Sequence, residues 1–241
     1  MTAAAILSPH PDDAVLSLWH LLTGPDDVLV LNVFGGSPNG HRGDGWWDTL
    51  TRAADSVERV RERHAEDREA LALAGRAPEN LGFLDGQYRH SEQPLEPLVD
   101  AIAAAVPSDA LLLAPAALDA HRDHQLVRAA ALALGARGHR VALYADIPHA
   151  NVYGWPAWVT ESEEDPYLDP MASWEHSMDA SGISLGSLSP EVHALDHSAA
   201  AAKREAVQRY RTQIPALDTQ YSMLLRPEVL RYEVVWPLPP A

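Results

Sequence analysis

The stretch AAAILSPHPDDAVLSLWHLLTGPDDVLVLNVF, residues 3–34, decides the fold. AAAILS at 3–8 and VLVLNVF at 28–34 are short apolar runs, typical of strands buried in a parallel sheet. Between them, DAVLSLWHLL at 13–22 carries apolar residues at helical spacing. A strand, a helix and a strand in this order predict a right-handed βαβ unit with two parallel strands.

The same alternation continues along most of the chain. Helices are expected over 50–75, 95–106 and 197–212, and a loop that leads into a helix over 118–138. Strands are expected over 80–84, 110–116, 140–147 and 231–236. Strands that alternate with helices predict a mostly parallel sheet covered by helices on both faces. We therefore expect an α/β protein with a Rossmann-like, three-layer architecture.

Two stretches interrupt this alternation. GGSPNGHRGDGWWD at 35–48 is rich in glycine and predicts a long loop. Residues 148–195 combine Pro, Trp, Ser and acidic residues without a clear period, so we expect an irregular excursion near the active site. Because neither an internal repeat nor a low-complexity linker occurs, we expect a single domain over 1–241.

Composition limits the classes of partner and cofactor. The formal net charge of −16 argues against nucleic acid and anionic membranes, which such a chain would repel. The chain has no cysteine, so a metal ion would have to be held by histidine and carboxylate. A signal-peptide pattern and a stretch of transmembrane length are both lacking, so we expect a cytoplasmic protein without membrane insertion.

Histidines and aspartates gather at two predicted strand-to-helix junctions. SPHPDD at 8–13 follows the first strand, and AHRDH at 120–124 follows the strand at 110–116. Ligands of doubly wound sheets bind at the carboxyl ends of the strands, so both segments can face one crevice. His121 and His124 are three residues apart and therefore share one side of a helical turn. Imidazoles and carboxylates pooled in this way fit a catalytic divalent metal, which takes three protein ligands and keeps a position for water.

Both segments resemble a known family of enzymes. HPDDAVLS at 10–17 and AHRDHQLV at 120–127 are similar to the paired motifs of the LmbE-like/PIG-L superfamily of metal-dependent N-acetylglucosaminyl deacetylases. RHAEDREALALAG at 63–75, NLGFLDG at 80–86 and KREAVQRYRTQ at 203–213 also resemble segments of that family, so the resemblance covers most of the chain. It implies the LmbE-like fold and hydrolysis of an N-acyl group.

The resemblance also implies a role for each residue of the two motifs. The implied ligands of Zn²⁺, with Fe²⁺ as an alternative ion, are His10, Asp13 and His124. Asp12 would be the general base that takes a proton from the metal-bound water. His121 would stabilise or protonate the tetrahedral intermediate, and Asp123 would orient a histidine. Amide hydrolysis needs these parts, because a metal lowers the pKa of water from 15.7 to about 7 and the amine leaving group needs an acid.

The implied substrate is a small molecule that carries an acetamido sugar. The residues expected to bind it are Arg63, Trp47 and Asp85. Arg63 matches a family position that contacts sugar hydroxyls, although an i,i+3 pair with Glu66 on a charged helix explains it nearly as well. Trp47 suits the apolar face of a pyranose ring, and a packing role suits it equally.

Other interpretations stay open at this point. A non-heme Fe(II) oxygenase uses two histidines and one carboxylate, and the H-x-D spacing would then make Asp12, rather than Asp13, the ligand. The alternation of strands and helices opposes that reading, because such triads usually lie in all-β folds. A non-catalytic sugar-binding relative is the third hypothesis. Asp146, at the end of a predicted strand, is either a partner of a ligand histidine or a turn cap.

Overall fold

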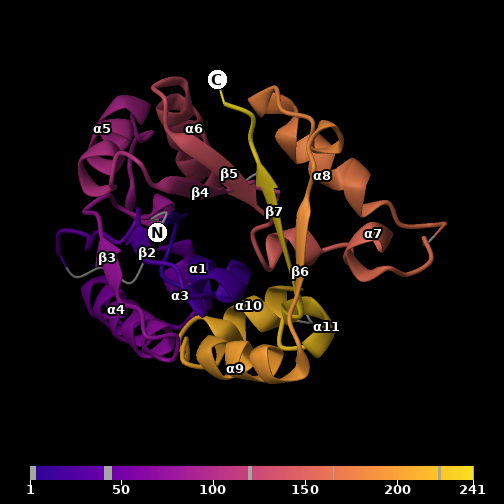
Figure 1. Ribbon diagram of the computed structural model, residues 1–241. Coiled ribbons are helices and arrows are strands. Elements are labelled where there is room, and N and C mark those ends of the chain that lie inside the picture. Colours follow the sequence, from indigo (N-terminus) through magenta and orange to yellow (C-terminus); the bar gives the residue numbers. More distant parts are fainter. Residues whose placement is uncertain (1–3, 41–44, 119–120, 165, 222–223, 241) are drawn as a thin grey trace.

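The computed structural model describes residues 4–40, 45–118, 121–164, 166–221 and 224–240 (Figure 1). The strands are β1 Ala4–Ser8, β2 Val28–Asn32, β3 Pro78–Asn80, β4 Leu111–Pro115, β5 Arg140–Tyr144, β6 Glu191–Ala194 and β7 Tyr232–Pro237. The helices are α1 Asp13–Ser17, α2 Trp19–Leu22, α3 Trp46–Leu50, α4 Ser56–Ala72, α5 Leu95–Ala105, α6 Arg122–Ala136, α7 Ala157–Thr160, α8 Pro170–Met178, α9 His197–Val207, α10 Ile214–Tyr221 and α11 Pro227–Leu230.

The strands form one sheet in the order β3-β2-β1-β4-β5-β7-β6. The first five strands of this order are parallel, with Ile6 of β1 opposite Val30 of β2 and Leu113 of β4. β7 pairs antiparallel with β5 and with the edge strand β6. The prediction of a mostly parallel sheet in an α/β fold is confirmed.

Helices cover both faces of the sheet and make three layers (Figure 1). One face packs against α1, α4 and α9, and the opposite face packs against α5, α6 and α8. Side chains of a strand alternate between the two faces, so Ile6 of β1 lies in the first core and Leu7 in the second. Because β1 and β4 are neighbours and parallel, their carboxyl ends open onto the same edge of the sheet.

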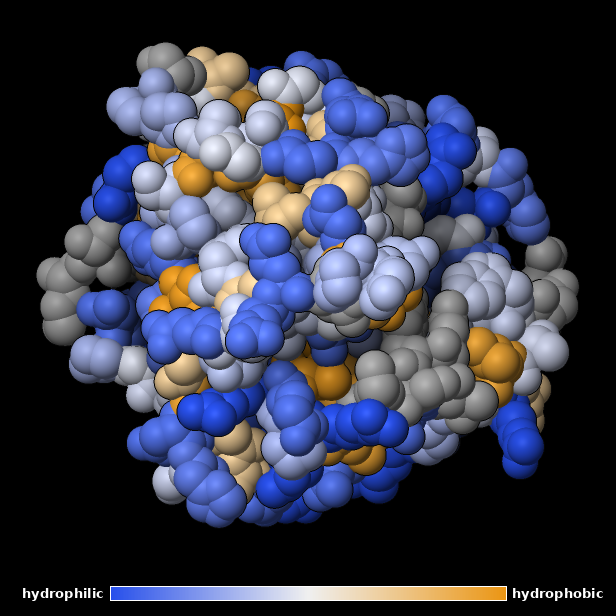
Figure 2. Space-filling model, turned by 90° about the vertical axis from the view of Figure 1, so that its right-hand side faces the viewer, coloured by the Kyte–Doolittle hydropathy of each residue, from blue (hydrophilic) through white to orange (hydrophobic). Residues whose placement is uncertain are grey.

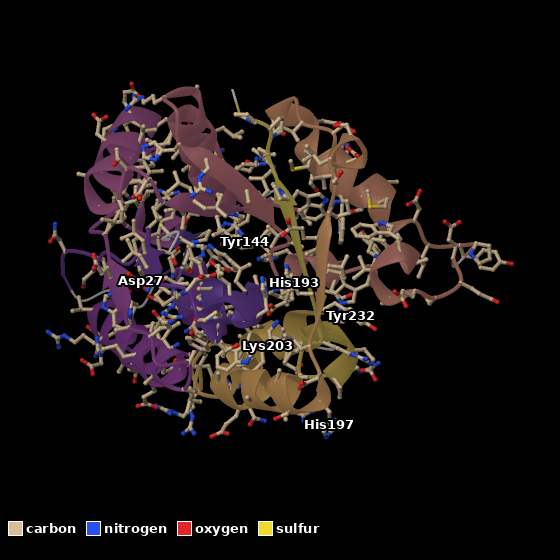
Figure 3. All side chains as sticks on the ribbon, in the orientation of Figure 1. Asp27, Tyr144, His193, His197, Lys203 and Tyr232 are labelled. Atoms are coloured by element: carbon tan, nitrogen blue, oxygen red, sulfur yellow. The ribbon has the colours of Figure 1, made fainter. Side chains whose placement is uncertain are left out.

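The single helix expected over 13–22 is interrupted, and this expectation was wrong in its detail. α1 ends before Leu18, and α2 begins at Trp19. The carboxylate of Glu233 in β7 accepts hydrogen bonds from the backbone N–H of Trp19 at 2.8 Å and of His20 at 2.9 Å. It also receives a bond of 2.6 Å from Nζ of Lys203, which projects from α9 (Figure 3). A cap supplied by the last strand therefore starts a new helix inside the expected one.

Two further stretches differ from expectation. The strand expected over 80–84 ends at Asn80, and only Leu84 returns to the sheet edge through an isolated bridge with Gly36. Residues 148–195 are more regular than expected, because they include α7, α8 and strand β6. β6 exists through its pairing with β7, which lies far away in the sequence.

The surface on the side of α7 and α8 is mostly hydrophilic, with apolar residues in separate small groups (Figure 2). Within the described ranges, every helix is too short or too polar to cross a membrane.

Candidate metal centre

The two predicted junctions meet at the carboxyl ends of β1 and β4. After β1, the hydroxyl of Ser8 donates to the carbonyl of His10 at 2.7 Å and accepts from the N–H of Ala14 at 3.2 Å. These bonds fold the PHPDD turn back over the end of the strand. His121 is the N-cap of α6, so the first turn of that helix brings His124 to the same place.

Donor atoms of His10, Asp13 and His124 converge in this turn. Nδ1 of His10 lies 3.5 Å, and Nε2 of His124 lies 3.6 Å, from Oδ2 of Asp13. All three side chains are buried, and one ligand atom from each lies within 4.8 Å of the others. A tetrahedral Zn²⁺ with bonds of about 2.0–2.2 Å keeps its donors roughly 3.3–3.5 Å apart. The spacing therefore fits a divalent ion.

The second nitrogen of each imidazole contacts a carboxylate. Nε2 of His10 lies 3.1 Å from Oδ2 of Asp123, and Nδ1 of His124 lies 2.9 Å from Oδ2 of Asp146. A carboxylate at one ring nitrogen holds the proton there and turns the lone pair of the other nitrogen toward a metal. Asp146 also accepts from the N–H of Leu118 at 3.2 Å, so both readings of this residue apply.

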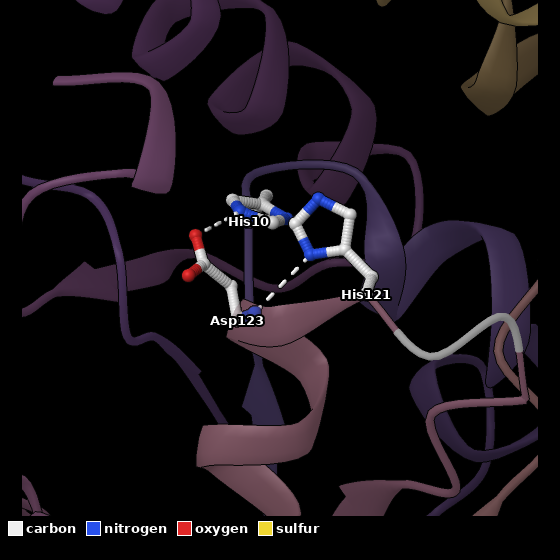
Figure 4. Close-up of side chains that lie close together, drawn as sticks. All are labelled: His10, His121 and Asp123. Atoms are coloured by element: carbon white, nitrogen blue, oxygen red, sulfur yellow. Dashed lines mark hydrogen bonds and ion pairs between the residues drawn. The ribbon is translucent and has the colours of Figure 1, made fainter. Parts of the chain in front are cut away.

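A second group of donors shares His10 with the first. His10, His121 and Asp123 also lie within 4.8 Å of one another (Figure 4). The Asp123 carboxylate, however, already accepts from Arg89 and from the N–H of Gly86 at 2.9 Å, besides His10. Nδ1 of His121 accepts from the N–H of Asp123 at 3.2 Å. An ion at this second group would displace existing hydrogen bonds, so the group with Asp13 fits a metal better.

Asp12 differs from its neighbour Asp13 in both backbone and contacts. Its φ of 138° lies in a region that side chains rarely adopt, which costs about 1–3 kcal/mol. Its side chain makes no cap hydrogen bond to α1, and its carboxylate has no hydrogen-bond partner among the described residues. Burial and the charge of Asp13 raise its pKa to about 8. Asp12 therefore presents to the chamber, beside the three donors, a carboxyl group that none of the described residues hydrogen-bonds.

The charged groups of the three donors shift one another's pKa values. Burial lowers the pKa of both histidines, but their carboxylate neighbours outweigh it, so the pKa of His124 rises to about 9 and that of His10 rises well above its ordinary value. Burial raises the pKa of Asp13, but the charges of His124 and His10 bring it below its usual range. The group therefore holds protons where a cation would bind, and metal binding would release them.

The chamber has a volume of about 140 Å³ and is lined by all three residues expected to bind substrate. Nη1 of Arg63 contacts Oδ2 of Asp85 at 3.1 Å, while Nε of Arg63 is buried without a partner. The i,i+3 pair with Glu66 does not form, because Glu66 accepts instead from the backbone and hydroxyl of Thr212. The side chain of Arg63 therefore lies in the chamber wall, where it contacts Asp85, and does not form an ion pair on the surface of α4.

Trp47 is almost fully buried in the wall of the chamber, where its Nε1 donates to Gln213 at 2.6 Å. Trp46 also lines the chamber, with 58% of its surface exposed. Gln213 and His149 also line the chamber and were missed by the sequence reasoning. The ring of His149 lies 5.1 Å from that of His124. The sequence signal that could have identified His149 is its position just after β5, a third strand that ends at this edge of the sheet.

The sequence profile of the family described as PIG-L, GlcNAc-PI de-N-acetylase, matches residues 5–134. This match covers more than half of the chain and includes both motifs. The chain therefore belongs to this family. A comparison with curated proteins finds no significant match.

Solved structures of deacetylases share the fold along the whole chain. A triple mutant of the deacetylase Orf2 from the teicoplanin biosynthetic pathway has a TM-score of 0.73 at 26% identity, covering 98% of this chain and 97% of that one. Dbv21, the deacetylase of the A40926 pseudoaglycone, has a TM-score of 0.71 at 25% identity, covering 100% and 98%. A zinc-inhibited form of the teicoplanin deacetylase Orf2, at 23% identity and a TM-score of 0.70 over 98% and 97%, supports the fold alone.

Proposed function

We propose that this protein is a metal-dependent hydrolase that removes an N-acetyl or related N-acyl group from a small molecule bearing an amino sugar. Membership of the PIG-L family and the likeness to deacetylase structures support an amide-hydrolysing enzyme. One observation carries the mechanism. The carboxyl group of Asp12, which none of the described residues hydrogen-bonds, lies beside three convergent donors, His10, Asp13 and His124.

We assign the metal to these three donors, with Zn²⁺ as the expected ion and Fe²⁺ as the alternative. When bound, a divalent cation supplies Lewis acidity, which lowers the pKa of water and polarises an amide carbonyl. Asp123 and Asp146 act through the two histidines, because each holds the proton of one imidazole on the nitrogen that faces away from Asp13.

Asp12 is the proposed general base, because a cation held by the three donors would lower its pKa and keep it ionised. It takes a proton from water as the water oxygen attacks the acyl carbon. His121 is proposed to stabilise the tetrahedral intermediate: Nδ1 accepts from the backbone N–H of Asp123, so the neutral ring carries its proton on Nε2 and donates from there to the oxyanion. The proton that Asp12 took from water passes to the nitrogen as the C–N bond breaks, and the products are a carboxylate and a free amine.

The sugar is proposed to lie against Trp47, with its hydroxyls bonded to Arg63 and Asp85. The partnerless Nε of the buried Arg63 supports this role, because an unsatisfied donor of this kind is costly in the absence of a ligand. Trp47 contributes an apolar wall whose position is fixed by the bond to Gln213.

A pair of neighbouring substitutions tests the mechanism. Protein loaded with Zn²⁺, or with Fe²⁺ under anaerobic conditions, is incubated with N-acetylglucosamine and its glycosides, and free amine is measured by fluorescamine. Asp12→Asn should retain the metal and lower kcat by about 10²–10⁴-fold, as expected for a lost general base. Asp13→Asn should instead lose the metal. The two variants change adjacent residues in the same way, so each is the matched control of the other.

The outcomes separate the competing functions. Loss of metal in Asp12→Asn but not in Asp13→Asn would favour the ligand set of an oxygenase. A wild-type protein that holds metal and releases no amine from any of these substrates would overturn the proposal in favour of a sugar-binding relative.

A further inference from the structure

A second and larger cavity adjoins the metal chamber. Its volume is about 930 Å³, within the range of ligand-binding sites. Trp46, Asp85 and His121 line both spaces, so the two are neighbours along one surface. The second cavity extends from there along α6 as far as Leu132. Nothing in the proposed hydrolysis requires this space.

The carboxylates that line the second cavity are all paired with arginines. Asp85 contacts Arg63 at 3.1 Å, Glu92 contacts Arg122, and Asp123 contacts Arg89. The two members of each pair neutralise one another, Arg63 doing so from the adjoining metal chamber. Among the residues that the structure describes, no lining carboxylate is left over to balance a further cation.

Arg128 is such a further cation. It lines the second cavity, yet only 4% of its surface is exposed. Its Nη1 donates to the carbonyl of Ala116 and, at 3.0 Å, to Sδ of Met178. Within the described part of the chain, no carboxylate lies within 4 Å of its guanidinium, and Nε and Nη2 make no hydrogen bond. Nε and Nη2 are therefore the two nitrogens left to bind a ligand.

A buried guanidinium without a counter-ion is costly, and a chain with a net charge of −16 does not lack carboxylates to place there. Burial indeed lowers the pKa of Arg128, although the charge of Asp146 raises it in part. The two contacts to Ala116 and Met178 fix the side chain without neutralising it. A guanidinium that is held in place but not neutralised is expected where an anionic ligand binds and balances its charge.

We propose that Arg128 forms an anion-binding subsite of the second cavity, which takes a carboxylate or phosphate group of the substrate. Arg128 follows His124 by four residues on α6 and so lies about 6 Å further along the same side of the helix. The anionic group is therefore close to the amide that is cleaved. The anion-binding subsite rests on the proposed function, and it narrows the substrate to an acetamido sugar that itself carries a negative charge.

Three compounds that differ mainly in charge test the subsite. N-acetylglucosamine is neutral, N-acetylmuramic acid carries a carboxylate, and N-acetylglucosamine 6-phosphate carries a phosphate. The wild-type, metal-loaded protein should bind one of the charged compounds at least about 10-fold more tightly than the neutral one, measured by calorimetry. This preference should weaken as salt is added. The compound that is favoured identifies the group as carboxylate or phosphate.

Substitutions locate the subsite. Arg128→Met should weaken binding of the favoured anionic compound by about 10–100-fold and leave the neutral compound unchanged. Arg128→Lys should retain part of the preference. Arg122→Met is the matched control, because Arg122 lines the same cavity but is exposed and paired with Glu92. Its loss should change the binding of neither the neutral nor the anionic compound.

Equal binding of the neutral and charged compounds by the wild type overturns the inference, as does an equal effect of Arg128→Met on both. If Arg128→Met fails to fold, as judged by its thermal melt, Arg128→Lys and the salt dependence of the wild type decide the question. Calorimetry measures binding and the release of amine measures hydrolysis, so the two proposals are tested by separate readouts. Amine release from none of the compounds, with a charge preference retained, would reject the proposed hydrolysis and keep the subsite.

Discussion

Replacing Asp146 by asparagine should weaken metal binding through the histidine that it contacts. Oδ1 of Asp146 accepts from the N–H of Leu118 at 3.2 Å, and a backbone donor needs an oxygen there. In Asp146→Asn the side-chain oxygen must keep this place, so the amide NH₂ faces Nδ1 of His124, which lies 2.9 Å from Oδ2 in the wild type. Nδ1 must then become an acceptor, and the ring proton moves to Nε2.

The shifted proton occupies the position that the metal needs. Nε2 of His124 is the nitrogen that lies 3.6 Å from Asp13, within the donor group. Loss of a carboxylate partner of a ligand histidine typically lowers metal affinity about 10–100-fold, which corresponds to about 1.4–2.7 kcal/mol. Because the substitution is nearly isosteric and keeps the bond to Leu118, we expect the fold to persist.

Competition with a chromophoric chelator measures the dissociation constant for Zn²⁺ in wild type and variant at one pH. Thermal melts of the metal-free proteins show whether the fold is retained. Asp27→Asn, which changes an exposed aspartate far from the site, is the control and should bind metal as the wild type does. An affinity of Asp146→Asn within about twofold of the wild type, in a folded protein, would refute the tautomer argument.

Three further predictions concern stability, each measured by denaturant unfolding. Burial raises the pKa of Asp67 from 3.8 to about 6, so its contribution is full below pH 3.8 and is lost as the pH rises through 6. The unfolding free energy of the wild type relative to Asp67→Asn should therefore fall by about 3 kcal/mol between pH 3.8 and about 7, and a pH-independent difference would contradict this pKa. Lys203→Met leaves the buried Glu233 without its ammonium partner, with His20 and the N–H of Trp19 as its remaining hydrogen-bond partners among the described residues, and should cost about 3–5 kcal/mol. Adding Glu233→Gln should recover part of the loss; a double variant less stable than the single one would exclude charge as the cause. A Cβ on Gly36 would lie 2.4 Å from the carbonyl oxygen of Gly82, so Gly36→Ala should cost about 1–3 kcal/mol, while Gly82→Ala, which meets open space, should cost less; equal effects would speak against the clash.

The sheet could be predicted from the sequence because its signals are local. Apolar runs at 3–8, 28–34, 110–116 and 140–147 correspond to β1, β2, β4 and β5, which form the centre of the parallel sheet. Parallel strands buried on both faces need continuous apolar runs, and such runs are visible without knowledge of the partner. The convergence of the two histidine-bearing segments follows from the rule that these strands end at one edge.

Features that depend on distant partners could not be predicted. The interruption at Leu18 is caused by Glu233, which lies more than two hundred residues further along the chain. Strand β6 forms only because β7 returns beside it, and Trp47 is fixed by Gln213. None of these pairs leaves a periodic or spacing signal, since each arises where two separate elements happen to pack.

The pair Asp12 and Asp13 shows most clearly why spacing alone left the ligand undecided. In a regular helix or strand, the geometry of one residue fixes the direction of the next, and either aspartate would then serve with His10. The backbone instead takes φ of 138° at Asp12, and Asp13 becomes the first residue of α1. Oδ2 of Asp13 accepts from the N–H of His10 at 2.8 Å, which turns this carboxylate toward both imidazoles and leaves Asp12 facing the chamber. The proposed division of roles between a base at Asp12 and a ligand at Asp13 thus depends on one unusual backbone conformation, which the spacing of residues in the sequence does not encode.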